Sequence, residues 1–87
     1  MHLILYSKPG CHLCEGLLEK LEQVTTPQIE QVEVRDITTQ EEWFQHYQYE
    51  IPVLCYKMPD GTEVTLPRLS PRAPVSRLAD LLAKALQ

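Results

Sequence analysis

The chain has 87 residues, with 8 Lys and Arg against 12 Asp and Glu, so its formal net charge is −4. Domains usually contain about 100 to 200 residues, so we predict that residues 1–87 form a single domain without a second lobe. The acidic excess argues against a nucleic-acid partner, because phosphate backbones are bound by clustered Lys and Arg.

Neither a membrane span nor an export signal is evident in the sequence. No apolar run approaches the roughly 20 residues that a membrane-spanning helix needs. The segment Met1–Leu5 is too short and uncharged to resemble a secretory signal, so we predict a cytoplasmic protein without a membrane partner. Three cysteines in such a chain do not suggest a framework of structural disulfides, which favours reactive or metal-binding cysteine.

The first third of the chain predicts a strand, a helix and a second strand. The apolar run His2–Tyr6 stops at a Ser-Lys-Pro-Gly turn, as a buried strand would. From Cys11 onward, apolar residues recur at helical spacing and predict a helix that ends near Thr25–Pro27. The mostly alternating pattern over residues 29–37 predicts the second strand.

A second helix is predicted over residues 39–48. Thr38 with Glu41, or Thr39 with Glu42, would form a capping box at its start. The aromatic residues that follow are spaced for packing in the core rather than for stacking on a nucleotide.

The last third of the chain predicts a hairpin and a helix. The strands Pro52–Tyr56 and Glu63–Leu66 flank a Pro-Asp-Gly turn, and a proline-broken loop follows them. Pro74 is a favoured first helical residue, and apolar residues at helical spacing predict a helix from there to the end. The order βαβαββα therefore predicts an α/β fold in which a right-handed parallel βαβ unit and an antiparallel hairpin share one sheet.

The motif Cys11-His12-Leu13-Cys14 stands where the first strand and turn lead into a helix. In that context a Cys-x-x-Cys pair is typical of a redox dithiol. Unpaired N–H groups and the positive end of the helix dipole would lower the pKa of Cys11 from ~8.5 into the range of about 3.5 to 7.5. Lys8 in the turn adds Coulombic support for the thiolate, and Glu15 opposes it.

Helical spacing also separates the roles of the two cysteines. Cys14 falls on the apolar stripe of the helix and Cys11 at its edge, so we expect Cys14 to be covered and Cys11 accessible. That asymmetry suits attack by Cys11 on a disulfide and resolution of the mixed disulfide by Cys14. His12 either stabilises the Cys11 thiolate when protonated or is an exposed polar residue, and the sequence favours neither reading.

A zinc site is the alternative for this cysteine pair. Zinc needs four ligands, and beyond Cys11 and Cys14 the chain offers only Cys55 and scattered histidines, so we predict no metal site. Cys55 lies in an apolar strand, where a free cysteine usually packs as a small hydrophobic residue. An iron-sulfur or other metal-binding module and a redox-inert interaction module stay open as alternative functions.

The segment Leu5–Cys14, with Ile51-Pro52-Val53 downstream and the βαβαββα order, resembles the glutaredoxin-like proteins of the thioredoxin fold. The resemblance implies a thioredoxin-like, four-stranded mixed sheet flanked by three helices, with the Cys11 and Cys14 dithiol at one end. It also implies a cis peptide bond before Pro52 and backbone hydrogen bonds from Ile51 to an extended substrate. The implied activity is that of a small thiol-disulfide oxidoreductase acting on protein or glutathione mixed disulfides.

Two features differ from the usual glutaredoxin pattern. Glutaredoxins usually carry Pro-Tyr between the cysteines and a glycine pair with an aspartate after the last strand, and both help to hold glutathione. This chain has His12-Leu13 and the loop Leu66–Arg72 at those places. Because the topology returns that loop to the dithiol, we hypothesise that Arg68 or Arg72 binds a carboxylate of glutathione or of an acidic protein segment. The alternative is that both are solvated loop charges.

The predicted chemistry requires no bound cofactor. Glutathione is one candidate reductant, and a disulfide reductase is the other candidate electron donor. Protein disulfides or glutathione adducts are the expected substrates, and we expect the protein to be a monomer.

Overall fold

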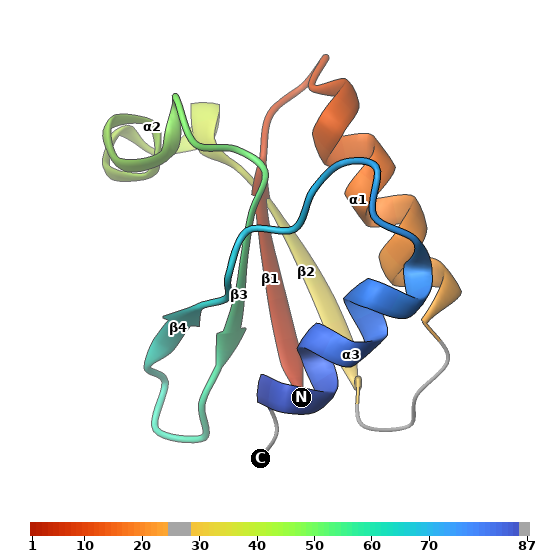
Figure 1. Cartoon of the computed structure of the whole chain (residues 1–87). Helices are drawn as coiled ribbons and strands as arrows, with labels where there is room; N and C mark the ends of the chain where they lie inside the picture. Colours follow the sequence, from red (N-terminus) through yellow and green to blue (C-terminus); the bar gives the residue numbers. More distant parts are fainter. Residues whose placement is uncertain (25–28, 86–87) are drawn as a thin grey trace.

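The computed structural model describes residues 1–24 and 29–85, and its elements follow the predicted order (Figure 1). They are β1 His2–Ser7, α1 His12–Gln23, β2 Gln31–Asp36, a 3₁₀ turn η1 Ile37–Thr39, α2 Glu41–Tyr47, β3 Val53–Lys57, β4 Glu63–Thr65 and α3 Val75–Ala85. The four strands form one sheet in the order β2-β1-β3-β4. Strand β1 is parallel to β2 and antiparallel to β3, and β3 pairs antiparallel with β4. The predicted α/β fold class is confirmed. Within the described residues, no helix combines the length and apolarity needed to cross a membrane.

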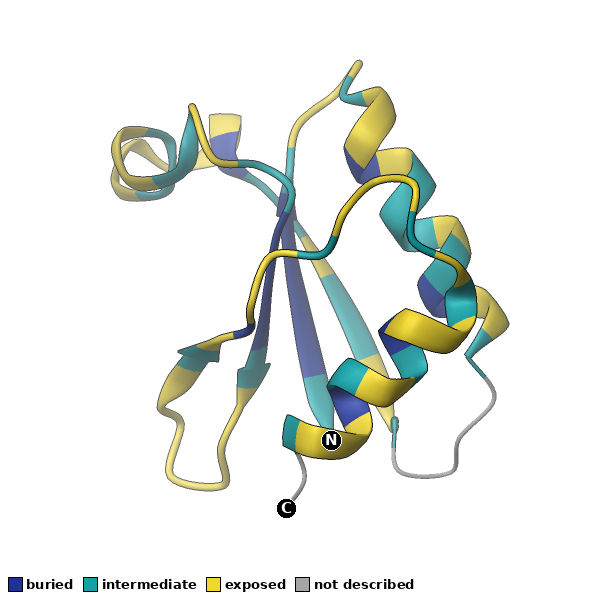
Figure 2. Ribbon diagram, in the orientation of Figure 1, coloured by how far each residue is buried: buried dark blue, intermediate teal, exposed yellow. Residues whose placement is uncertain are grey.

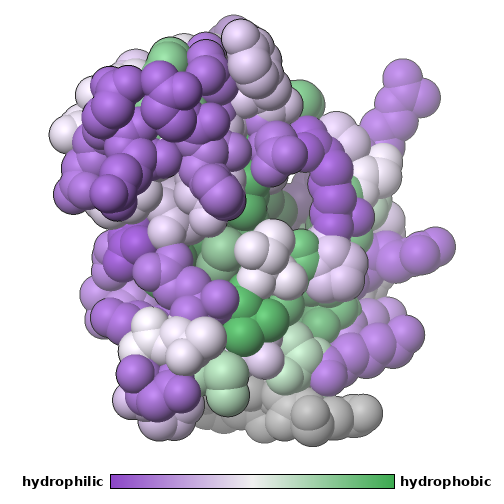
Figure 3. All heavy atoms as spheres, turned by 90° about the vertical axis from the view of Figure 1, so that its left-hand side faces the viewer, coloured by the Kyte–Doolittle hydropathy of each residue, from purple (hydrophilic) through white to green (hydrophobic). Residues whose placement is uncertain are grey.

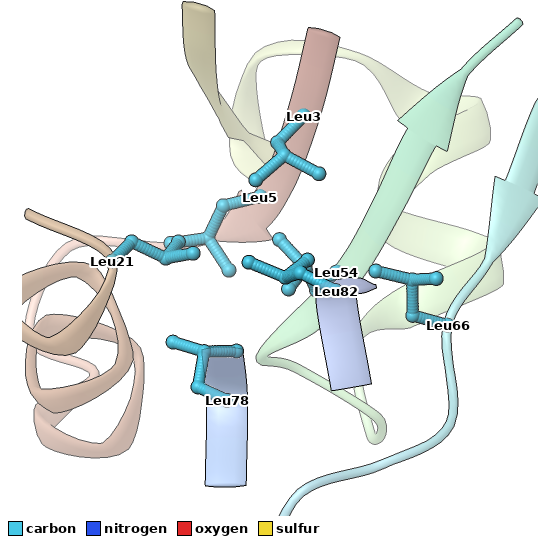
Figure 4. Packing of buried hydrophobic residues seen from close by; sticks show 7 residues of the cluster. All are labelled: Leu3, Leu5, Leu21, Leu54, Leu66, Leu78 and Leu82. Atoms are coloured by element: carbon cyan, nitrogen blue, oxygen red, sulfur yellow. The ribbon is translucent and has the colours of Figure 1, made fainter. Parts of the chain in front are cut away.

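One face of the sheet is covered by α1 and α3. Leu3 and Leu5 of β1 pack there against Leu21 of α1 and against Leu78 and Leu82 of α3 (Figure 4). All of these leucines are buried, and β1 is dark blue along most of its length in Figure 2. Burying a leucine side chain contributes about 1.5 to 3 kcal/mol, so this cluster holds α1 firmly against the sheet.

The opposite face is covered by the shorter helix α2. Because side chains alternate along a strand, Ile4 and Tyr6 point to this side, where they form a second buried cluster with Ile37, Val53 and Cys55. Half-buried side chains of α2 and the following turn close the cluster: Trp43, Phe44, Tyr47 and Ile51. The core role predicted for the aromatic residues of α2 is therefore confirmed.

The predicted capping box of α2 is wrong. The N-cap of α2 is Gln40, whose side chain makes no capping hydrogen bond. Thr38 and Thr39 lie in η1, where the carboxylate of Asp36 accepts hydrogen bonds from the amide of Thr38 at 2.9 Å and from its hydroxyl at 2.6 Å. The threonines are thus engaged by the turn that ends β2, and this turn delays the start of α2 to Glu41.

The other helix boundaries differ little from the prediction. Helix α1 ends at Gln23, and the predicted stop at Thr25–Pro27 lies outside the described residues. Helix α3 begins at Val75, one residue after Pro74, and the predicted last turn at residues 86–87 lies outside the described residues.

The turn between β1 and α1 needs a glycine at position 10. Gly10 has a φ of +81°, in the left-handed region, and a Cβ there or at Gly16 within α1 would meet no atom within 4 Å. We expect Gly10→Ala to lower the free energy of unfolding by about 1 kcal/mol through backbone strain. Gly16→Ala should raise it by roughly 0.5 kcal/mol, because alanine favours a helix. Urea unfolding measures both, and equal effects of the two variants would contradict this account.

Candidate active site

The two cysteines of the motif are joined by a disulfide at the start of α1, with their Cα atoms 5.3 Å apart. Cys11 is the N-cap residue of the helix, and its Sγ accepts a hydrogen bond from the amide of Cys14 at 3.2 Å. Cys14 is buried and Cys11 is half-buried, which is the predicted order of exposure. The sulfur of Cys11 therefore lies where unpaired N–H groups and the helix dipole stabilise an anion.

The charged residues at the helix start are exposed. The carbonyl of Lys8 accepts a hydrogen bond from the amide of Cys11 at 3.3 Å, which closes the turn before the helix. The side chain of His12 is 93% exposed, and its Nδ1 lies 3.6 Å from Oε2 of Glu15. His12 is thus placed beside Glu15, and the electrostatic roles of Lys8 and His12 stay predictions.

A groove of about 640 Å³ lies beside the cysteine motif. Its walls come from α1, from the segment between α2 and β3, and from the loop between β4 and α3. Most of the lining is apolar, including Leu13, Leu17, Pro52, Leu66 and Leu69. Figure 3 shows the face that carries α2 and the β3–β4 hairpin, where hydrophobic surface lies between hydrophilic side chains. A groove of this size can accept an extended chain segment or a small molecule.

The segment before β3 places Pro52 in this groove. The Ile51–Pro52 peptide bond is cis, and Pro52 lines the groove together with His12 and Leu13. Ile51 packs instead against the cluster under α2, and its amide donates a hydrogen bond to the carbonyl of Tyr47 at 3.2 Å. The Ile51 amide is therefore hydrogen-bonded within the tight turn that follows α2. The carbonyl of Ile51 is the group that can make the predicted backbone hydrogen bond to a substrate.

The two arginines of the β4–α3 loop occupy different places. Arg68 lines the groove, and its Nη1 donates a hydrogen bond to the carbonyl of Glu50 at 2.8 Å. Arg72 is exposed and is not among the described residues that line the groove. The loop turns at Ser70, whose carbonyl accepts from the amide of Ala73 at 3.0 Å. The structure therefore places Arg68 in the groove wall and Arg72 outside it, and substrate binding by Arg68 stays a prediction.

The sequence does not point to Lys20, which also lines the groove. Its Nζ donates a hydrogen bond to the carbonyl of Pro71 at 2.7 Å and so joins α1 to the β4–α3 loop. On the helical pattern alone, Lys20 is an ordinary solvated residue of the polar face. The carbonyl that it binds is 51 positions away, so no local signal indicates the contact.

A polar network lies on the α2 side of the sheet, and the sequence does not indicate it either. Arg35 of β2 donates hydrogen bonds to Glu33, to the hydroxyl of Tyr6 at 2.8 Å and to Glu63 of β4 at 3.1 Å. Its guanidinium carbon lies 5.2 Å from the ring centre of Trp43. The hydrogen bond from Arg35 lowers the pKa of Glu33, and the hydrogen bonds from Tyr6 and Arg35 lower that of Glu63. The network joins β2 to β4 across the strands between them.

The third cysteine is buried in β3, as predicted. The sulfur of Cys55 lies 3.7 Å from the hydroxyl of Thr65, and burial raises the pKa of its thiol, which disfavours the reactive thiolate. In the part of the chain that the structure describes, no group of three or more His, Cys, Asp and Glu side chains is arranged to hold a metal ion. Cys11 and Cys14 therefore gain no third ligand from these residues.

Comparison with known proteins agrees with this geometry. Residues 2–83 match the family described as "Glutaredoxin-like domain (DUF836)". The structure is similar to that of target protein XcR50 from X. campestris, with 25% identity, a TM-score of 0.63 and coverage of 94% of this chain and 96% of that one. It is also similar to thioredoxin 1 from Thermosipho africanus TCF52B, with 16% identity, a TM-score of 0.64 and coverage of 99% and 94%. No match to a curated protein was found.

Proposed function

Because this chain belongs to the glutaredoxin-like domain family, we propose that it is a thiol-disulfide oxidoreductase with Cys11 as nucleophile and Cys14 as resolving thiol. The observation that carries the proposal is the Cys11–Cys14 disulfide at the start of α1, with Cys11 as N-cap and Cys14 buried. The helix start favours a thiolate at Cys11, and the thiolate is the form of cysteine that attacks disulfides.

The proposed reaction moves two electrons from the dithiol to a substrate disulfide. The Cys11 thiolate attacks one substrate sulfur, forms a mixed disulfide and releases the other sulfur as a thiolate, which takes up a proton. Cys14 then loses its proton and attacks the sulfur of Cys11. The bond between Cys11 and the substrate breaks, a second thiol leaves, and the Cys11–Cys14 disulfide remains. A thiol reductant, either glutathione or the dithiol of a disulfide reductase, restores the reduced enzyme.

We propose that an extended substrate binds in the groove beside the cysteine motif, where His12 and Leu13 form part of the wall. The apolar lining of the groove would hold the substrate side chains. We propose that the carbonyl of Ile51, which immediately precedes the groove-lining Pro52, accepts a hydrogen bond from the substrate backbone. Protein disulfides and glutathione adducts both fit this description. We further propose that the protein works in the cytoplasm, where thiols are kept reduced.

The reactivity of the reduced protein tests the proposal. We expect iodoacetamide to alkylate Cys11 at a rate that is nearly constant down to pH values well below the ~8.5 of a free thiol, because the thiolate persists there. Oxidised glutathione or a peptide disulfide should convert the reduced protein to the Cys11–Cys14 disulfide, with release of two thiols. Peptide mapping by mass spectrometry assigns each modified cysteine. Alkylation of Cys11 no faster than free cysteine between about pH 5 and 8 would contradict the proposal.

A further inference from the structure

The segment between α2 and β3, which carries the proposed substrate-binding backbone, is held from two directions. The amides of Glu50 and Ile51 both donate to the carbonyl of Tyr47, at 2.9 and 3.2 Å. The carbonyl of Glu50 accepts the hydrogen bond from Nη1 of Arg68 at 2.8 Å. The bonds to Tyr47 are local, because they close the end of α2. The bond from Arg68 is tertiary, because that arginine is 18 positions further along the chain.

The loop that carries Arg68 is itself anchored on both sides of that residue. Before it, the amide of Leu66 donates to the carbonyl of Leu54 at 2.9 Å and extends the pairing of β4 with β3. After it, Leu69 packs against the cluster of buried leucines that lies between the sheet and helices α1 and α3. Nζ of Lys20 in α1 donates a hydrogen bond to the carbonyl of Pro71 at 2.7 Å. In Figure 1 this loop runs from β4 past α1 to α3. The backbone of Arg68 is therefore held in place by contacts on both sides.

We propose that Arg68 is a positioning residue for disulfide exchange: its hydrogen bond to the carbonyl of Glu50 holds the Ile51–Pro52 peptide in the groove wall. The inference rests on the proposed function. Pro52 and Arg68 line the same groove as Leu13 of the cysteine motif, so a shift of the Pro52 segment moves a bound substrate relative to Cys11. Small displacements of reacting atoms slow a bimolecular attack strongly, and Arg68 thus acts through the backbone.

The test compares Arg68→Ala, Arg68→Lys and the same-loop control Arg72→Ala. Each reduced variant is mixed with uncharged bis(2-hydroxyethyl) disulfide and, separately, with anionic glutathione disulfide, and formation of the Cys11–Cys14 disulfide is timed in single turnovers. We expect Arg68→Ala to slow both reactions by the same factor, about tenfold, because a charge-assisted hydrogen bond to the Glu50 carbonyl is lost. Arg68→Lys keeps a donor and should restore most of the rate, while Arg72→Ala should match the parent.

Two outcomes would overturn this role. If Arg68→Ala slowed only the reaction with glutathione disulfide, Arg68 would bind a substrate carboxylate rather than position the backbone. If Arg68→Ala matched Arg72→Ala with both disulfides, the hydrogen bond to Glu50 would have no part in the reaction.

Amide hydrogen exchange separates failure of this inference from failure of the proposed function. Arg68→Ala should speed exchange at the amides of Glu50 and Ile51, and Arg72→Ala should not, because only the first variant frees the segment. Unchanged exchange in Arg68→Ala would overturn the positioning role. A parent protein that neither disulfide oxidises would contradict the proposed function, and the exchange result would still decide whether Arg68 holds this segment.

Discussion

Cys11→Ser should abolish oxidation of the reduced protein by either a peptide disulfide or oxidised glutathione, slowing it by about three orders of magnitude or more. A serine hydroxyl is not ionised near neutral pH and forms no mixed disulfide, so the first step of the exchange is lost. Cys14→Ser keeps the attacking sulfur at the start of α1 but removes the thiol that resolves the intermediate. We expect this variant to stop at a mixed disulfide with a peptide substrate. With glutathione adducts, a second glutathione can release the product, so turnover should persist.

Mass spectrometry of acid-quenched reactions distinguishes these outcomes, because the trapped mixed disulfide adds the mass of one substrate half to the protein. Cys55→Ala is the matched control, since Cys55 is the buried third cysteine and its thiol is disfavoured as a nucleophile. This control should react at the parent rate. Exchange that survives in Cys11→Ser, or disappears in Cys55→Ala, would show that the nucleophile has been assigned to the wrong cysteine.

Arg35→Met should lower the free energy of unfolding by about 2 kcal/mol at neutral pH. The change keeps much of the side-chain volume and removes the donor shared by Tyr6, Glu33 and Glu63. The Arg35 side chain is 14% exposed, while the two carboxylates are 34% and 32% exposed, so water replaces part of the lost interaction and the effect stays below that of a fully buried pair. Arg77→Met, on the exposed face of α3, should have little effect and serves as control.

The same network makes the stability depend on pH in a defined direction. In the folded protein, the hydrogen bond from Arg35 lowers the pKa of Glu33, and the hydrogen bonds from Tyr6 and Arg35 lower that of Glu63. The unfolded chain therefore binds more protons in acid. The stability that the carboxylates of Glu33 and Glu63 contribute is fully present above the ordinary glutamate pKa of 4.5. It is lost as the pH falls through their lowered pKa values. Urea unfolding of parent and Arg35→Met should therefore give a stability difference that shrinks below pH 4.5. A difference that is independent of pH would contradict this assignment.

Local patterns in the sequence were sufficient for the order of elements and for the candidate redox cysteines. The apolar run of β1 and the helical spacing of Leu21 in α1 depend on neighbours within a few positions, and these are visible in the chain. The exposure of Cys11 relative to Cys14 follows from the same spacing. The capping box of α2 failed because Asp36 competes for the same threonine, and sequence patterns do not rank such competing local bonds.

The tertiary structure alone decided the long-range polar contacts, two of which lie in the walls of the groove. Arg68 reaches Glu50 across 18 positions, and Lys20 reaches Pro71 across 51. Arg35 meets Glu63 across 28 positions because the sheet order places β2 and β4 on either side of β1 and β3. The acceptors for Arg68 and Lys20 are backbone carbonyls, which every residue carries, so the sequence contains no mark of them. The positions of these carbonyls depend on how the buried leucines pack α1 and α3 against the sheet. They also depend on the path of the loop between β4 and α3.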